Sequence, residues 1–140
     1  MTDVFQTTIA VRGYELDSLG HVNGAVYLQY AEHARWTCLR AAGVTAGVLQ
    51  AARLAPVRLE ETVRYHRELG AGDEVDVSCA FTWGEGKTFR LHQDFLLPDA
   101  ALAAEVDSVG GLLDVDTRRL VAEPTRHFRS IAAVPDLLGL

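Results

Sequence analysis

The side chains most able to do chemistry gather in one short segment, residues 14–27. Asp17, His21 and Asn23 lie there, directly before the apolar pattern of a long helix begins. A helix N-terminus offers unpaired backbone N–H groups and the positive end of the helix dipole, which polarise an oxygen that gains negative charge. A carboxylate beside such a terminus can attack a polarised carbon or activate water. The segment therefore contains the components of a hydrolytic site.

Considered residue by residue, the same segment also has a structural interpretation. Asp17 lies in the sequence Asp-Ser-x-Gly, which is common in turns, and Asn23 is a common residue at the start of a helix. Local chemistry alone favours this interpretation. The choice between a turn and a site therefore depends on the wider pattern.

The wider pattern extends from the loop into the helix. It reads Asp17-x-x-Gly20-His21-Val22-Asn23-x-Ala25-Val26-Tyr27-x-x-Tyr30-x-Glu32-x-x-Arg35. This pattern resembles the motif of the hotdog-fold thioesterases of the 4-hydroxybenzoyl-CoA thioesterase type. Residues 14–17 and 22–27 also look like the plant and bacterial acyl-thioesterases that act on fatty acyl and β-ketoacyl carriers. The resemblance extends over residues 5–125.

The resemblance implies an enzyme that hydrolyses an acyl-CoA or acyl carrier protein thioester to a free acid and a thiol. The family's catalytic loop carboxylate corresponds to Asp17, acting as nucleophile on the thioester carbonyl or as general base on water. The family's helix N-terminal amide, which polarises the carbonyl, corresponds to Gly24. Asn23 is expected to cap the helix or orient water, and His21 to contact Asp17 or hold the loop. No metal and no bound cofactor are implied.

Two further residues are expected to bind the substrate. Tyr27 is the helix aromatic that we expect in an acyl pocket, whereas other aromatic residues of the helix are expected to pack in the core or a dimer contact. Arg64 is a candidate for holding CoA phosphates or the acidic surface of an acyl carrier protein. The same role is open to Arg58, Arg67, Lys87 and Arg90. A solvated charge on a strand face is the alternative for each of them.

A second branch of hotdog thioesterases carries its catalytic carboxylate on the central helix, where this chain has Glu32. Because Asp17 occupies the loop position, we expect Glu32 to be a structural partner of Arg35 or of a subunit contact. A paired and partly buried charge is the ordinary role of such a residue.

The elements that must position these residues follow from hydrophobic periodicity. Residues 5–14 alternate as a strand, and residues 23–42 carry apolar side chains at helical spacing up to Gly43. After a short segment at 45–54, period two returns in residues 57–66, 75–81 and 89–97. Residues 102–115 supply one more strand, in which Gly110-Gly111 predicts a bulge or a close backbone approach.

This order predicts an α+β fold with an antiparallel sheet against one face of the helix. The resemblance specifies the hotdog fold, in which the sheet wraps around one long central helix. We expect a single hotdog domain over residues 1–140, with its core at about 5–125 and an irregular or weakly helical tail after Pro124. Free strand edges favour pairing with a second copy, so a homodimer or a dimer of dimers is expected. The resemblance places two active sites at the subunit interface.

Composition and charge narrow the class of protein. Thirteen Lys and Arg against nineteen Asp and Glu give a net charge of -6, which disfavours nucleic acid and anionic membranes as partners. The two cysteines form no CxxC pair, and the five histidines lack metal-ligand spacing. The sequence contains no G-x-S-x-G elbow, no signal-like start and no apolar run of membrane-spanning length, so we expect a cytoplasmic protein.

Two alternatives to hydrolysis remain. A hotdog domain that binds or senses an acyl thioester without cleaving it would have the same fold. A hotdog dehydratase or hydratase would need a His and a carboxylate arranged across a β-hydroxyacyl chain, and the sequence lacks the His-containing motifs of those families. Acyl length, the choice between CoA and carrier protein, and the pathway are open.

Overall fold

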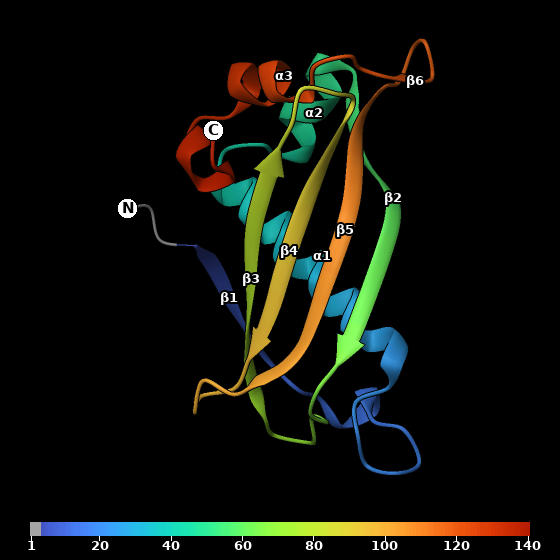
Figure 1. The fold of residues 1–140 in the computed structure, drawn as a ribbon, viewed down its shortest axis with the longest axis vertical. Coiled ribbons are helices and arrows are strands. Elements are labelled where there is room, and N and C mark those ends of the chain that lie inside the picture. Colours follow the sequence, from blue (N-terminus) through green and yellow to red (C-terminus); the bar gives the residue numbers. More distant parts are fainter. Residues whose placement is uncertain (1–3) are drawn as a thin grey trace.

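The computed structural model describes residues 4–140. Its elements, in chain order, are β1 (Phe5–Ala10), the 3-10 helix η1 (Gly13–Glu15), α1 (Gly24–Ala41), α2 (Ala46–Ala52), β2 (Leu54–Tyr65), β3 (Glu74–Trp83), β4 (Thr88–Leu96), β5 (Leu102–Asp114), β6 (Arg119–Leu120), α3 (Pro124–Ile131) and the 3-10 helix η2 (Pro135–Leu138). All strand pairs are antiparallel, in the order β1-β3-β4-β5-β2, with β6 paired to β5. Figure 1 shows the sheet curling around α1. The predicted α+β class is confirmed.

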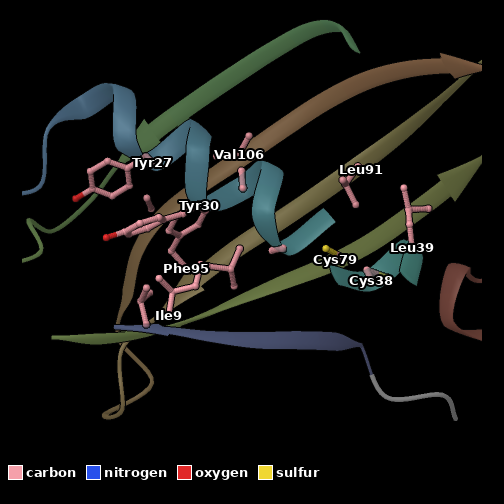
Figure 2. Packing of buried hydrophobic residues seen from close by; sticks show 14 of the residues in the cluster. Ile9, Tyr27, Tyr30, Cys38, Leu39, Cys79, Leu91, Phe95 and Val106 are labelled. Atoms are coloured by element: carbon pink, nitrogen blue, oxygen red, sulfur yellow. The ribbon is translucent and has the colours of Figure 1, made fainter. Parts of the chain in front are cut away.

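The core lies between α1 and the inner face of the sheet. Ala31, Ala34 and Cys38 on α1 are completely buried, and their small side chains let the helix lie directly on the strands. Large apolar residues of the strands, such as Phe95, point toward the helix in Figure 2. Each large side chain buried in this way contributes about 1.5–3 kcal/mol to folding. The side chain of the buried Gln93 donates a hydrogen bond to the Ala31 carbonyl at 2.9 Å, which joins the helix to β4.

The glycine pair of β5 marks a close approach, as predicted. A Cβ added at Gly111 would lie 2.8 Å from a methyl carbon of Leu120, and one at Gly110 would lie 3.1 Å from the Phe89 ring. The register irregularity in this part of the sheet lies on the neighbouring strand β2, between residues 58 and 60.

The two ends of the chain differ from expectation. The first strand ends at Ala10, and Gly13–Glu15 form η1 where the strand was expected to continue. The tail after Pro124 was expected to be irregular or weakly helical, but it forms α3 and η2 and packs on the sheet. Phe128 is buried with its ring centroid 5.4 Å from that of Trp83, whose Nε1 donates to the Leu138 carbonyl at 2.6 Å. The contacts that order the tail therefore come from a distant strand.

The tail also closes the C-terminal end of α1. Gly43 follows the helix with φ of 88°, and its N–H donates to the Arg40 carbonyl at 2.9 Å. A Cβ added at Gly43 would lie 2.7 Å from the Cβ of Ala133 and 2.9 Å from its backbone nitrogen. The turn therefore requires glycine both for its conformation and for space.

The loop that enters α1 is anchored by a buried carboxylate. Glu15 accepts hydrogen bonds from the Tyr30 hydroxyl at 2.5 Å and from the Arg12 N–H at 2.8 Å, and its own carbonyl accepts from the Asn23 N–H at 3.0 Å. Burial alone would raise the pKa of the Glu15 carboxyl, but the Tyr30 hydrogen bond and the contacts with Arg12 outweigh it, so the pKa is lowered. Burial and the bond to Glu15 raise the pKa of Tyr30, which keeps its phenol protonated.

Replacing Gly43 tests the requirement for glycine at the end of the helix. Gly43→Ala should lower the free energy of unfolding by about 1–2 kcal/mol from the left-handed backbone alone, with a further loss from the contact with Ala133. Gly47→Ala is the control, because Gly47 lies within α2 without a close neighbour and should gain about 0.5–1 kcal/mol. Urea unfolding measures both, and a Gly43→Ala protein as stable as wild type would contradict this packing.

Replacing Tyr30 tests the anchor. Tyr30→Phe leaves the buried Glu15 carboxylate without its hydroxyl donor and should cost about 1–3 kcal/mol of unfolding free energy. Tyr14→Phe removes a hydroxyl from a residue that is 84% exposed and should change stability by less than about 0.5 kcal/mol. Equal unfolding midpoints for the two variants would show that the Glu15–Tyr30 bond does not anchor the loop.

Candidate active site

The loop between η1 and α1 is closed on itself and fixed to the rest of the chain. Leu16 and Val22 form an isolated antiparallel bridge, and the Asp17 N–H donates to the His21 carbonyl at 2.7 Å. The Val22 N–H donates to the Leu69 carbonyl at 2.8 Å, which ties the loop to the segment after β2. These contacts hold Asp17 at a defined position beside the start of α1.

The two carboxylate oxygens of Asp17 have different surroundings. Oδ1 accepts hydrogen bonds from the N–H groups of Leu19 at 2.9 Å and His21 at 3.2 Å. Oδ2 accepts no hydrogen bond from any part of residues 4–140, and the side chain is exposed. One oxygen therefore stabilises the turn while the other is free for chemistry, so the structural and chemical interpretations of Asp17 are compatible.

The start of α1 presents a free backbone donor. Asn23 precedes the helix, and its Oδ1 accepts from the Ala25 N–H at 3.0 Å, as expected of a cap. The N–H of Gly24, the first residue of the 18-residue helix, has no hydrogen-bond acceptor within the described chain. Because Gly24 has no side chain, a carbonyl oxygen could approach this N–H at the positive end of the helix dipole.

Asp17 and Gly24 line the same solvent-open cavity, whose volume is ≈ 440 Å³. Its walls are Asp17, His21, Val22, Gly24, Tyr27, Tyr65, His66, Arg67 and Glu68. The structure therefore brings together four residues predicted for the site, which are Asp17, His21, Gly24 and Tyr27. A space of this size beside a free donor and a free carboxylate oxygen could hold a thioester and part of its acyl group.

Aromatic side chains form the inner wall of this cavity. Tyr27 is 3% exposed. Its ring packs edge-on against Tyr65 at a centroid distance of 5.1 Å and lies tilted against Phe95 at 5.8 Å. Burial raises the pKa of Tyr27, so its phenol stays neutral. The Tyr65 hydroxyl donates to the Gly24 carbonyl at 3.2 Å, which joins the end of β2 to the first turn of α1.

Charged and basic side chains predicted for the site differ in how they lie relative to this cavity. The His21 backbone contacts Asp17, while its ring Nε2 lies 3.9 Å from a Glu68 carboxylate oxygen. Arg64 does not line the cavity, and it pairs with Asp107 at 2.9 Å. Arg67 lines the cavity and lies 3.4 Å from Asp99, so it brings a positive charge to the cavity wall.

Glu32 lies apart from the cavity that holds Asp17. Its carboxylate is 3.7 Å from Arg58 and 4.0 Å from Arg35, so the expected pairing with Arg35 is present and a second arginine is closer. Glu32 and Arg35 line a smaller cavity of ≈ 100 Å³ between α1 and β2.

Sequence reasoning missed three side chains in the cavity wall, those of Tyr65, His66 and Glu68. They lie at the end of β2 and in the segment after it, more than forty positions from the loop motif in the chain. Periodicity placed Tyr65 in a strand over residues 57–66 but contained no signal that the end of this strand would meet the start of the helix. No helix of the described residues is long and apolar enough to cross a membrane.

Comparison with known proteins identifies the family. Residues 11–136 match the model of the thioesterase-like superfamily. The chain is 30% identical over 118 residues to the long-chain acyl-CoA thioesterase FadM of Escherichia coli K12, covering 84% of this chain and 89% of that protein. It is 28% identical over 115 residues to the chloroplastic acyl-acyl carrier protein thioesterase ATL3 of Arabidopsis thaliana, covering 81% of this chain and 60% of that protein.

A solved structure agrees with this match. The probable thioesterase YbaW of Escherichia coli superposes with a TM-score of 0.77 at 30% sequence identity, over 84% of this chain and 88% of that one. The strand order, the central helix and the length of the family match all point to the same architecture. The chain belongs to the thioesterase-like superfamily and has the hotdog fold of its thioester hydrolases.

Proposed function

We propose that this protein hydrolyses acyl thioesters, with Asp17 as the catalytic carboxylate and the Gly24 N–H as the donor that polarises the thioester carbonyl. The observation that carries this proposal is the shared cavity, in which a carboxylate oxygen and a helix N-terminal amide both lack protein partners among residues 4–140. Relatives named as acyl-CoA and acyl carrier protein thioesterases support the reaction class.

The chemistry follows from where charge develops. As the carbonyl carbon becomes tetrahedral, its oxygen gains negative charge and is stabilised by the Gly24 N–H and the dipole of α1. Asp17 either attacks the carbonyl carbon, forming an anhydride that water then hydrolyses, or removes a proton from an attacking water. In both routes the carbon–sulfur bond breaks, and the products are a carboxylic acid and a thiol.

The substrate class follows from the cavity wall and from the relatives. Tyr27 and Tyr65 offer an apolar surface to an acyl group, and Arg67 lies at the same cavity for an anionic part of the carrier. We propose a fatty-type acyl group on CoA or on an acyl carrier protein, the two carriers named for FadM and ATL3.

The outer edge of β2 supports a dimer. β2 is the terminal strand of the five-strand path, it has 12 residues, and it exposes Leu59 at 48% and Tyr65 at 56%. Long edge strands with exposed apolar residues are favoured sites for pairing with another chain. We propose that two copies pair antiparallel along β2, which would bring the start of one β2 beside the cavity of the other copy.

Replacing Asp17 tests the chemistry. Asp17→Asn retains the oxygen that accepts from Leu19 and His21 but removes the nucleophile or base, so turnover should fall about 10²–10⁴-fold with little change in stability. Thiol release is measured from a panel of aliphatic, β-ketoacyl and aromatic thioesters of CoA and of an acyl carrier protein.

Asp114→Asn is the matched control for this substitution. Oδ1 of Asp114 also accepts from two backbone N–H groups, those of Asp116 and Thr117, but this residue is the last of β5 and does not line the cavity of Asp17. Its turnover should equal that of wild type. Near-normal activity of a folded Asp17→Asn protein would refute the assignment, and tight acyl-CoA binding without thiol release by wild type would favour a non-catalytic sensor.

The dimer is tested by a charge at the centre of β2. Leu59→Glu adds a third acidic residue next to Glu60 and Glu61, so two copies meeting there would repel each other. Val134→Glu changes a residue of similar exposure, 44%, away from β2. Light scattering after gel filtration should show two chains per particle for wild type and Val134→Glu, and one chain for Leu59→Glu. A wild-type monomer, or a dimeric Leu59→Glu protein, would contradict pairing along β2.

A further inference from the structure

The outer face of the sheet carries a cluster of histidine and carboxylate side chains that the proposed hydrolysis does not use. His92 and Asp94 lie two residues apart on β4, and Glu105 and Asp107 lie two residues apart on β5. The register pairs His92 with Asp107 and Asp94 with Glu105. Gln93, which lies between His92 and Asp94 on β4, is buried and faces α1. Because side chains alternate along a strand, all four side chains of the cluster lie on the opposite face of the sheet.

His92 is surrounded by acceptors. Its Nδ1 lies 2.8 Å from an Asp107 oxygen, and its Nε2 lies 2.7 Å from an Asp94 oxygen and 3.8 Å from a Glu105 oxygen. A neutral imidazole has one N–H donor and one lone pair. When Nδ1–H donates to Asp107, the lone pair of Nε2 faces two carboxylates and would repel them. A cation, either a proton or a metal ion, is therefore required between Nε2 and these oxygens.

Three groups converge on that position. The ligand atoms of His92, Asp94 and Glu105 all lie within 4.8 Å of one another. Bonds of about 2.0–2.2 Å from zinc to nitrogen and oxygen place neighbouring ligand atoms roughly 3–4 Å apart, so small side-chain rotations suffice. The three side chains are partly buried and stand on adjacent strands of a rigid sheet, which limits the entropy lost on binding.

The side chains next to His92 and Glu105 hold them in fixed orientations. In protein metal sites, the residues that contact the metal ligands have the same role. Asp107 accepts from Nδ1 of His92 and is itself held by Arg64 at 2.9 Å, which leaves Nε2 as the ligand atom. His66 lies 2.7 Å from Oε2 of Glu105, the oxygen not directed at His92. A carboxylate on the second nitrogen of a ligating histidine is the usual arrangement at protein metal sites.

We propose that His92 Nε2, Asp94 and Glu105 bind a divalent transition-metal ion of the zinc type on the outer face of the sheet, with Asp107 and His66 as orienting neighbours. The imidazole favours zinc, cobalt or nickel over magnesium and calcium, which prefer all-oxygen sites. Three protein ligands leave the remaining positions to water. His66 also lines the cavity of Asp17, so the two sites share one wall residue.

The test is zinc binding by the full-length, untagged chain after chelator treatment and dialysis. Titration calorimetry with zinc chloride at neutral pH should show one saturable site per chain in wild type, and calcium chloride should show none. His92→Asn and Asp94→Asn should each abolish this site, and Asp107→Asn should weaken it about 10–100-fold. Cobalt chloride should give a visible absorption band that the first two variants lose.

His33→Asn is the matched control, because His33 is an exposed histidine on α1, outside the cluster. It should bind zinc as wild type does. Absence of a saturable site in wild type, or equal affinity of the wild-type and His92→Asn proteins, would overturn the proposal and leave a protonated His92 as the cation. Circular dichroism of each variant verifies folding, and the measurement is independent of thioester hydrolysis.

Discussion

The contact between α1 and the curled sheet determines the geometry of the rest of the molecule. Ala31, Ala34 and Cys38 are completely buried and bring the helix backbone close to the strands. The sheet covers the inner side of the helix from Ala31 to Cys38, but the first residues of the helix, including Gly24, are exposed beside the end of β2. The free N–H groups and the positive dipole end of α1 are thus presented at the mouth of a cavity.

Both ends of this helix are held by contacts distant in the chain. At the N-terminal end, Glu15 joins the entering loop to Tyr30, about two turns into the helix. At the C-terminal end, the tail packs over Gly43, and the Val134 N–H donates to the Ala42 carbonyl at 3.0 Å. The loop that carries Asp17 is therefore part of the folded framework, although the Asp17 side chain itself is exposed to solvent.

Local patterns predicted much of this arrangement, and distant contacts account for what was missed. Apolar periodicity placed the helix at 23–42, and the observed helix is Gly24–Ala41 with Asn23 as its cap. The two agree because helical spacing and capping depend on residues close together in the chain. The family motif identified Asp17, His21, Gly24 and Tyr27, which the structure gathers at one cavity. Strand pairing is not encoded in this local way. It gave Arg64 a carboxylate partner on the outer face and set Glu105 beside Asp94 in a cluster that no residue spacing indicated. Packing between distant aromatic rings, those of Phe128 and Trp83, likewise ordered α3.

Polarisation of the thioester carbonyl by the Gly24 N–H beside Asp17 is tested most directly by a crystal structure. The protein is crystallised with an acyl-CoA analogue whose thioester sulfur is replaced by a methylene group. The ketone of such an analogue keeps the carbonyl and cannot be hydrolysed. The proposed mechanism places its oxygen about 2.7–3.1 Å from the Gly24 nitrogen, with the carbonyl carbon facing the free oxygen of Asp17. A carbonyl bound away from the start of α1, with the Gly24 N–H contacting water or another group, would contradict it.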